Sequence, residues 1–230
     1  MIWMFPIFAG ASLISALWLL ATPIQESPAE RSSSMGEVFS VLRDRKIRLL
    51  FLGIVAIVGI DVGLNTLAPK LLIERCGMPL ESAGYGSSVY FFCRVIGAFT
   101  GTLLLTRLSD RTYYFSHILL GLAVLGALYF AQSRYAILIA LGVEGFAFSS
   151  IFAVIYSQAL KHMPARANEI SGLMITGVFG GAVVPPLMGV LTDAVGSQAG
   201  SLAVLTLFAL YLLGCGLMIR SEKTESHVSA

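Results

Sequence analysis

Long apolar runs separated by short polar segments cover most of the chain. A run of about 18 or more apolar residues is long enough to cross the hydrocarbon layer of a membrane as a helix. The runs of this length occupy residues 2–20, 49–72, 83–105, 113–131, 136–158, 170–191 and 201–219. The pattern predicts an all-α membrane protein with seven transmembrane helices.

The composition supports the same fold class. Of 230 residues, 57% are hydrophobic and 12% are charged, and the mean hydropathy is +0.84. Soluble domains carry about 25% charged residues, so we expect a lipid bilayer around this chain rather than water. The net charge of +2 gives no reason to expect a nucleic-acid partner. Cys76, Cys93 and Cys215 are odd in number and suggest neither a disulfide framework nor a metal site.

Basic residues are distributed unequally between alternate loops, and this predicts the orientation. Short loops rich in Lys and Arg stay in the cytoplasm. One side holds 11 of these residues and the other side three. The larger set is Arg31, Arg43, Arg45, Lys46, Arg48, Arg107, Arg111, Lys161, Arg166, Arg220 and Lys223, and the smaller is Lys70, Arg75 and Arg134. The C-terminus is therefore expected in the cytoplasm and the N-terminus outside.

These segments predict four regions: a transmembrane helix at 1–20, a cytoplasmic loop at 21–48, a six-helix domain at 49–219 and a cytoplasmic tail at 220–230. A secretory signal at the start is disfavoured, because the first run lacks a basic segment before it and is too long. Within the loop, residues 23–34 read as a flexible linker rich in Pro, Ser and Glu. Ser34 and Glu37 then form a capping box ahead of a short amphipathic helix, which lies on the membrane surface or forms an ordinary solvated loop.

Three runs carry an ionisable side chain near their midpoints: Asp61, Arg94 and Glu144. Each costs about 2.5 to 3.5 kcal/mol at the bilayer centre, so such residues usually face a partner or a water-filled path. The first, fourth and seventh runs carry no charge and are expected to be the lipid-facing supports. The sixth run instead holds the helix breakers Gly172, Gly177, Gly180, Gly181, Pro185, Pro186 and Gly189, which are tolerated where freed backbone groups face protein or a cavity.

The runs also repeat with a period of three. Asp61 and Glu144 lie in the first helix of each unit, and the second helices end alike, in Leu108-Ser109-Asp110 and Leu191-Thr192-Asp193. A repeat with an odd number of spans is inverted in the membrane, and inverted repeats are a feature of secondary transporters.

Three segments resemble a known family. Residues 171–174 and 180–193 are similar to the eleventh helix of major facilitator superfamily sugar porters of the fucose permease type. Residues 145–152 resemble their tenth helix and residues 59–63 their seventh. Two positions depart from the pattern: Ala153 replaces a usual Pro, and Tyr113 and Tyr114 replace the Gly and basic residues after Asp110-Arg111 in the facilitator loop motif.

The resemblance implies a C-terminal portion, helices six to twelve of a twelve-helix facilitator, with the 3+3 inverted repeat preceded by one helix. It implies secondary active transport of a small solute, a hexose or deoxyhexose moved by proton symport, in a bacterial inner membrane. The N-terminal half of the path would then be missing. The family usually places its coupling carboxylates in that half, so they are not assigned here.

The substrate-pathway candidates are Asp61, Asn65, Tyr90, Arg94, Glu144 and Phe148. Asp61 and Asn65 share one helix face, as do Tyr90 and Arg94. Alternatively, Asp61 and Arg94 form a structural ion pair, Arg94 pairs with Glu144, and the aromatic stripe beginning at Phe148 is packing. Helix-packing and gating roles are expected for Gly177, Gly180, Gly181, Pro185 and Pro186, and a cytoplasmic loop role for Asp110 and Arg111.

Other function classes remain as alternatives. A facilitator exporting another small solute would share all of these features. A seven-helix receptor or sensor is a further alternative, although a retinal protein needs a Lys in its last helix and residues 201–219 have none. The chain has no H-E-x-x-H and no G-x-S-x-G motif, so we expect neither an enzyme nor a cofactor.

Overall fold

The computed structural model describes residues 4–22 and 35–219, and all regular elements within these ranges are helices. They fall into two units, residues 1–34 and 35–230, which are treated separately. The elements are α1 (Met4–Ala21), α2 (Met35–Ser40), η1 (Val41–Arg43), α3 (Arg45–Cys76), α4 (Leu80–Ala83), α5 (Tyr85–Arg107), α6 (Asp110–Phe130), α7 (Arg134–Phe148), α8 (Ile151–His162), η2 (Pro164–Arg166), α9 (Ala167–Thr176), η3 (Gly177–Phe179), α10 (Gly180–Val195), α11 (Ala199–Cys215) and η4 (Gly216–Met218).

The predicted all-α fold with seven apolar helices is confirmed. Six helical stretches are long and apolar enough to span a membrane, and a shorter apolar helix, Phe5–Ala21, precedes them. The spans are Arg45–Cys76, Leu80–Arg107, Asp110–Phe130, Arg134–His162, Pro164–Val195 and Ala199–Met218. The predicted linker, the capping residue Ser34 and the tail at 220–230 lie outside the described residues.

Polar caps explain where several of these helices begin. The Asp44 carboxylate accepts hydrogen bonds from the backbone N–H groups of Lys46 (2.8 Å) and Ile47 (2.9 Å). Ser109 caps α6 in the same way through the N–H of Thr112, at 3.2 Å. Each cap satisfies backbone donors that have no partner within the helix. At the other end, Gly77 closes α3 with a φ of 61°, a conformation that favours glycine.

The cap at Asp44 also divides the loop helix that the sequence predicts. Residues 35–40 are helical as expected, but Asp44 has an extended backbone, with φ −69° and ψ 126°. The short helix therefore ends before Asp44, and α3 starts at Arg45. Arg166 anchors α2 by donating to the Glu37 carbonyl (2.9 Å) and to Ser40 Oγ (2.8 Å). The position of α2 on a membrane surface stays a prediction.

Two spans are interrupted near their middles. Between α7 and α8 the helix breaks at Ser149 and Ser150, where Ser149 Oγ donates to the Phe146 carbonyl at 2.8 Å. The span containing α9 and α10 tightens to a 3₁₀ turn at Gly177–Phe179. The second interruption begins at Gly177, one of the helix breakers noted in this span, whereas the first has neither Gly nor Pro at the break.

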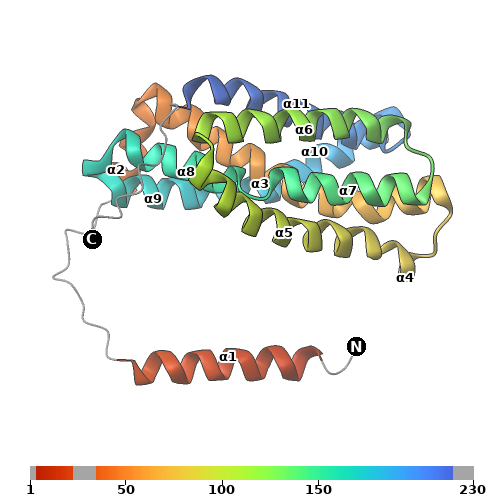
Figure 1. The fold of residues 1–230 in the computed structure, drawn as a ribbon, viewed down its shortest axis with the longest axis horizontal. Coiled ribbons are helices and arrows are strands. Elements are labelled where there is room, and N and C mark those ends of the chain that lie inside the picture. Colours follow the sequence, from red (N-terminus) through yellow and green to blue (C-terminus); the bar gives the residue numbers. More distant parts are fainter. Residues whose placement is uncertain (1–3, 23–34, 220–230) are drawn as a thin grey trace. The chain divides into compact units, whose positions relative to one another are not determined.

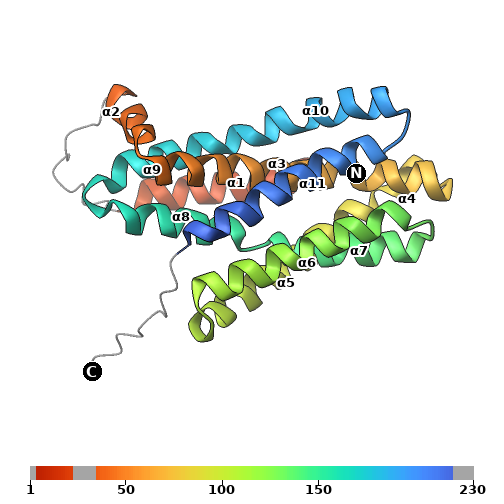
Figure 2. The same ribbon diagram turned by 90° about the horizontal axis from the view of Figure 1, so that it is seen from above.

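The six spans of residues 35–219 pack around α3 and α7 (Figures 1 and 2). Helix α5 packs mainly against α7 and also touches α3, α6 packs against α7 and α11, and α10 packs against α3 and α11. Close contact between α3 and α10 depends on small residues. A Cβ on Gly59 would overlap Val184, and one on Gly180 would overlap the Val55 carbonyl.

The expectation that the charge-free runs are the lipid-facing supports is wrong for the fourth and seventh runs. The α5 span carries Arg94 yet is the least buried of the six, whereas the charge-free α6 and α11 spans are more buried. Tyr114 on α6 and Leu205 on α11 belong to the core. Burial follows the number of neighbouring helices, and α5 lies at the edge of the bundle with few of them.

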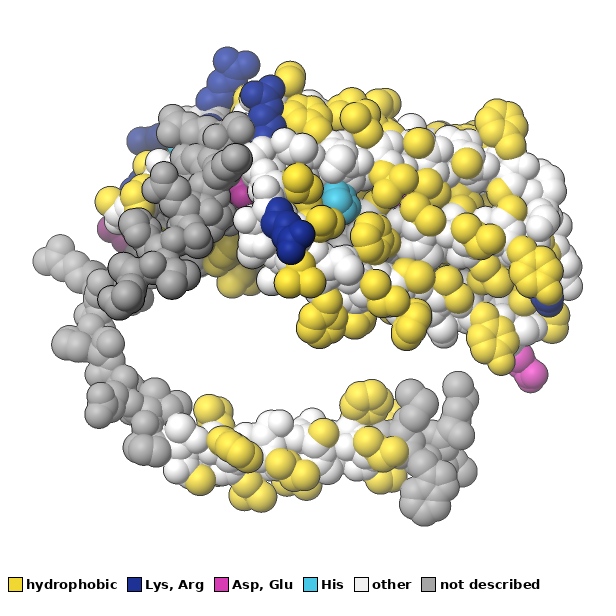
Figure 3. Space-filling model, in the orientation of Figure 1, with side chains coloured by type: hydrophobic (Ala, Val, Ile, Leu, Met, Phe, Trp, Pro, Cys, Tyr) yellow, Lys and Arg dark blue, Asp and Glu magenta, His cyan; other side chains and the backbone are white. Residues whose placement is uncertain are grey.

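Charge collects at one end of the bundle. Figure 3 shows Lys and Arg side chains mainly at the end where α2 lies, with hydrophobic side chains over most of the remaining face. The same end contains the start of α3, the turn from α5 into α6, and the connection from α8 to α9. This distribution is the one that a membrane interface requires.

Candidate substrate pathway

Asp61 is the centre of a polar cluster formed by α3 and α5. Its Oδ1 atom accepts a hydrogen bond from the Tyr90 hydroxyl at 2.5 Å and forms an ion pair with Arg94 Nη1. Arg94 Nη1 also lies 3.3 Å from the Tyr90 hydroxyl. The three side chains thus form one connected network, which we call the Asp61 cluster.

The predicted polar stripes explain why these residues meet. Ser87, Tyr90 and Arg94 follow one face of α5, and Asp61 and Asn65 follow one face of α3. The two helices run in opposite directions, because Ser87 Oγ donates to the Asn65 carbonyl at 3.2 Å while Arg94 reaches back to Asp61. The stripes therefore face each other over about two helical turns.

The Asp61 cluster combines a buried hydroxyl with partly accessible charges. Tyr90 is fully buried, whereas the side chains of Arg94 and Asp61 are 25% and 21% exposed. Each charge is neutralised by the other, which lowers the cost of placing them at membrane depth. The half-buried side chain of Asn65 lies on the same face of α3 as Asp61.

Glu144 does not join this cluster. It is fully buried on α7, and neither of its carboxylate oxygens has a hydrogen-bond partner among the described residues. The pairing of Arg94 with Glu144, one of the alternatives above, is not what the structure shows, because Arg94 pairs with Asp61.

Phe148 is also fully buried, and it packs as part of the bundle core. A Cβ on Gly121 of α6 would lie only 2.6 Å from its ring. Further along the aromatic stripe, Phe152 and Tyr156 stack on each other with ring centroids 6.0 Å apart. This geometry matches the packing interpretation of the stripe, since no ring face of Phe148 is open to a solute.

The glycines expected to mediate helix packing all lie against α3. A Cβ on Gly177 would come within 2.7 Å of Ile54, and one on Gly181 within 2.9 Å of Val62. Gly180 meets the Val55 backbone, as described above. Pro185 and Pro186, the other two residues predicted for helix packing and gating, lie within α10. Their gating role stays a prediction.

Asp110 of the loop motif ties α6 to α8. Its Oδ2 atom accepts hydrogen bonds from Gln158 Nε2 (2.9 Å) and Lys161 Nζ (3.2 Å). Arg111 is exposed and stacks over the Phe115 ring, with its guanidinium carbon 5.6 Å from the centroid. The sequence reasoning missed Gln158 and Lys161. Their i, i+3 spacing places both on one face of α8, but only the fold brings that face to Asp110.

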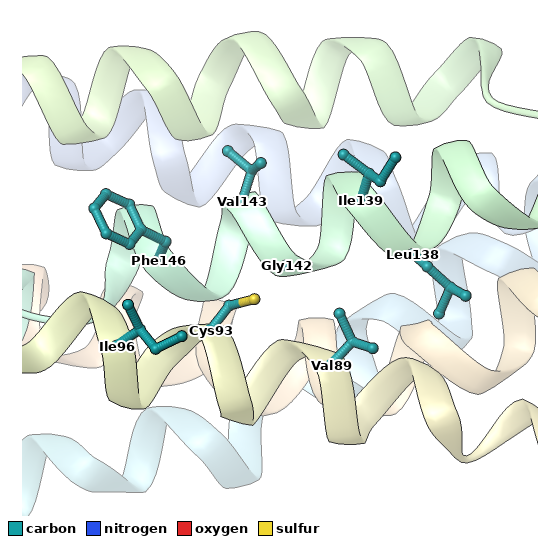
Figure 4. Close-up of a pocket in the computed structure, with 8 residues that line it drawn as sticks. All are labelled: Val89, Cys93, Ile96, Leu138, Ile139, Gly142, Val143 and Phe146. Atoms are coloured by element: carbon teal, nitrogen blue, oxygen red, sulfur yellow. The ribbon is translucent and has the colours of Figure 1, made fainter.

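An apolar groove of about 440 Å³ lies between α5 and α7 (Figure 4). It is lined by Val89, Cys93, Ile96, Leu138, Ile139, Gly142, Val143 and Phe146. Without polar groups it cannot orient a hydroxylated solute. Among the described residues no group of three His, Cys, Asp or Glu side chains could hold a metal ion. The Asp61 cluster is therefore the candidate site.

The model of the Major Facilitator Superfamily matches residues 1–184. The chain belongs to this superfamily. Its members are membrane transporters rather than an enzyme class, and the chain is an integral membrane protein.

Named relatives support the assignment to this superfamily. The chain is 25% identical over 184 residues to a Helicobacter pylori protein named as a candidate glucose/galactose transporter. This alignment covers 79% of this chain and 44% of the relative. It is 24% identical over 200 residues to the L-fucose-proton symporter of Escherichia coli, covering 83% of this chain and 45% of the relative. The chain thus spans about half the length of the curated relatives it matches.

A solved facilitator structure has the same fold. The crystal structure of the transporter FucP in the outward conformation superposes with a TM-score of 0.80 at 22% identity. The match covers 95% of this chain and 54% of FucP. The predicted seven-helix facilitator portion is therefore confirmed as a fold.

Proposed function

We propose that this chain forms the C-terminal half of a proton-coupled sugar transporter. The observation that carries the proposal is the Asp61 cluster, a hydrogen-bonded carboxylate in the middle of two spans of a facilitator fold. The names of the relatives, a fucose-proton symporter and a glucose/galactose transporter, support a sugar as the solute. Their greater length supports a missing N-terminal portion.

In this proposal the Asp61 cluster binds sugar hydroxyls. A carboxylate oxygen accepts hydrogen bonds, and a carboxamide can both donate and accept. Asp61 and Asn65 would therefore contact neighbouring hydroxyls of a hexose or deoxyhexose from one face of α3. Arg94 and Tyr90 hold the Asp61 carboxylate in place, since both donate to the same oxygen.

The membrane and the orientation belong to the same proposal. We place the protein in a bacterial inner membrane with the basic end of the bundle in the cytoplasm, because short basic loops stay on that side. Residues 1–20 would be the sixth helix of a facilitator, 21–48 the cytoplasmic connection between halves, 49–219 the C-terminal six-helix domain and 220–230 a cytoplasmic tail. A reporter fused after Ala230 should then be active in the cytoplasm, and one inserted at Gly77 or Gly196 outside it.

Uptake in a reassembled transporter tests the proposal. Expressed alone, residues 1–230 should insert without saturable uptake of fucose, galactose or glucose, because alternating access needs two halves. Co-expression with a matching five-helix N-terminal segment should restore uptake. Robust uptake by the 230-residue chain alone would contradict the half-transporter proposal, and no uptake of any of the sugars after reassembly would contradict the substrate class.

Two variants of the reassembled transporter locate the sugar contact. Asn65→Ala should weaken sugar affinity, since an unpaired hydroxyl in a desolvated site costs about 1 to 3 kcal/mol. The matched control is the adjacent Thr66→Ala, because the Thr66 hydroxyl is already bonded to the Val62 carbonyl at 2.8 Å. Equal affinities in the two variants would remove Asn65 from the site.

A further inference from the structure

Glu144 occupies a position at which every equivalent residue on its helix face is apolar. Ile137, Leu141, Glu144 and Phe148 follow one another at intervals of three or four residues, and all four are fully buried. They form the core-facing stripe of α7. The carboxyl group of Glu144 therefore projects into the hydrophobic interior of the bundle.

Another face of α7, which carries Gly142 and Gly145, packs closely against α5. A Cβ on Gly145 would overlap the Tyr90 carbonyl, and one on Gly142 would lie 3.0 Å from the sulfur of Cys93. This close contact presses α7 against α5 along the face that carries the two glycines. Gly145, the residue after Glu144, thus lies against Tyr90 of the Asp61 cluster, yet Glu144 itself makes no hydrogen bond to the cluster.

Both carboxylate oxygens of Glu144 lack a hydrogen-bond partner among the described residues. The ionisable groups on the elements packed against α7 do not supply one. Asp61, Tyr90 and Arg94 bond to each other, and Tyr114 donates to the Leu212 carbonyl. On α6, His117 Nδ1 lies 2.9 Å from the Tyr113 carbonyl and the two rings stack, whereas His117 Nε2 and the Tyr113 hydroxyl are, like Glu144, buried without a hydrogen-bond partner among the described residues. Cys93, on α5, faces the apolar groove.

An isolated ionised carboxylate in such surroundings is unfavourable by several kcal/mol, far more than a neutral acid in the same place. The least costly occupant of the site is a proton bound to one of the two oxygens. Arg94, the cation near the midpoint of the α5 span, is bonded to Asp61 rather than to Glu144.

We propose that Glu144 is a proton-binding site of the C-terminal half, separate from the Asp61 cluster. In the arrangement seen here the carboxyl group is the neutral acid. When the helices around α7 move apart and water reaches the side chain, the O–H bond breaks, the proton passes to water, and the carboxylate remains until it is protonated again. The use of this proton in coupling rests on the proposed function, whereas its presence on Glu144 does not.

Infrared spectroscopy of the chain in lipid tests the bound proton without any transport. At neutral pH the spectrum should contain the C=O stretch of a protonated carboxylic acid, and Glu144→Gln should remove it. The matched control is Glu81→Gln, because Glu81 is exposed on α4 and should leave the band unchanged. A wild-type spectrum without the band, or a band that survives Glu144→Gln, would overturn the proposal.

A second measurement covers the case in which Glu144→Gln fails to fold. Solid-state NMR of the wild-type chain with ¹³C-labelled glutamate carboxyl groups should show one protonated side chain at neutral pH. If all glutamate signals are those of carboxylates, the site does not hold a proton.

The reassembled transporter then tests coupling. Glu144→Gln should retain exchange of sugar across the membrane but lose accumulation driven by a pH gradient. Accumulation equal to wild type would show that the buried acid is structural and would overturn its role in coupling. Absence of sugar transport in the wild type would instead refute the proposed function and leave the infrared result standing.

Discussion

Arg94 on α5 and Asp61 on α3 form an ion pair across two neighbouring spans. Two of the three charges that the sequence places within the membrane therefore neutralise each other. The pair is partly exposed, so it serves both to hold the two helices together and to present polar atoms on one face. The third charge, Glu144, is left without a partner among the described residues.

Breaking the ion pair from one side should destabilise the protein. Asp61→Asn or Arg94→Gln leaves the other charge unpaired at membrane depth, and breaking fully buried pairs costs about 3 to 5 kcal/mol. We expect a smaller loss here, about 1 to 3 kcal/mol, because the side chains are partly exposed and solvent screens them. Thermal unfolding in detergent measures it.

The double variant Asp61→Asn/Arg94→Gln provides the control for that experiment. Removing both charges leaves no unpaired ion, so it should be more stable than either single variant. Strictly additive losses would show that the two residues do not interact.

Glycine at the contact of α3 and α10 should be irreplaceable. Gly180→Ala places a methyl group against the Val55 backbone, which cannot move without shifting the helix. Overpacking of this kind costs about 1 to 3 kcal/mol. The matched control is Gly189→Ala on the same helix, where nothing lies within 4 Å of the added Cβ. The melting temperatures of the two variants should differ, with Gly180→Ala lower; equal values would contradict the close approach.

Several of these features follow from the sequence and others do not. The spans are predictable because apolar length is sufficient evidence for them, and the stripe of Ser87, Tyr90 and Arg94 is predictable from helical spacing. The sequence does not predict whether Arg94 pairs with Asp61 or with Glu144, since both carboxylates lie near the midpoints of their runs on different helices. Nor does spacing reveal the break at Ser149, which has no Gly or Pro to mark it.

Long-range contacts account for the remaining errors. Gln158 and Lys161 reach Asp110 across about fifty residues of sequence, so only the packing of α8 on α6 identifies them as partners. The burial of α6 and α11 depends likewise on which helices surround them. The local sequence pattern predicts which residues share a helix face, but it does not predict which other helix packs against that face.

The N-cap of α3, Asp44, should make the stability of the protein depend on pH in the acidic range. The backbone N–H of Ile47 holds the pKa of Asp44 below its ordinary value, and His162 and the N–H of Lys46 act in the same direction against the opposing effect of burial. Because the folded-state pKa is depressed, the stabilisation is present above the unfolded pKa and is lost as pH falls through the folded value.

Asp44→Ala tests that dependence. It should lower stability by about 1 kcal/mol at neutral pH, the usual effect of losing an N-cap. The difference from wild type should shrink as the pH is lowered below the ordinary aspartate pKa of about 4. Melting temperatures across this range measure it, and a difference that does not change with pH would show that the Asp44 charge makes no contribution.

The most direct test of the central claim, that the Asp61 cluster lines the sugar path, is thiol labelling at Asn65. In a reassembled transporter with Cys76, Cys93 and Cys215 replaced, Asn65→Cys keeps the ion pair intact and should react with a water-soluble reagent. The transported sugar should slow that reaction. Leu207→Cys, at a side chain that is 67% exposed on the apolar face of α11, should stay unlabelled because lipid covers it. No reaction at Asn65→Cys, or a reaction rate that sugar does not change, would contradict the account.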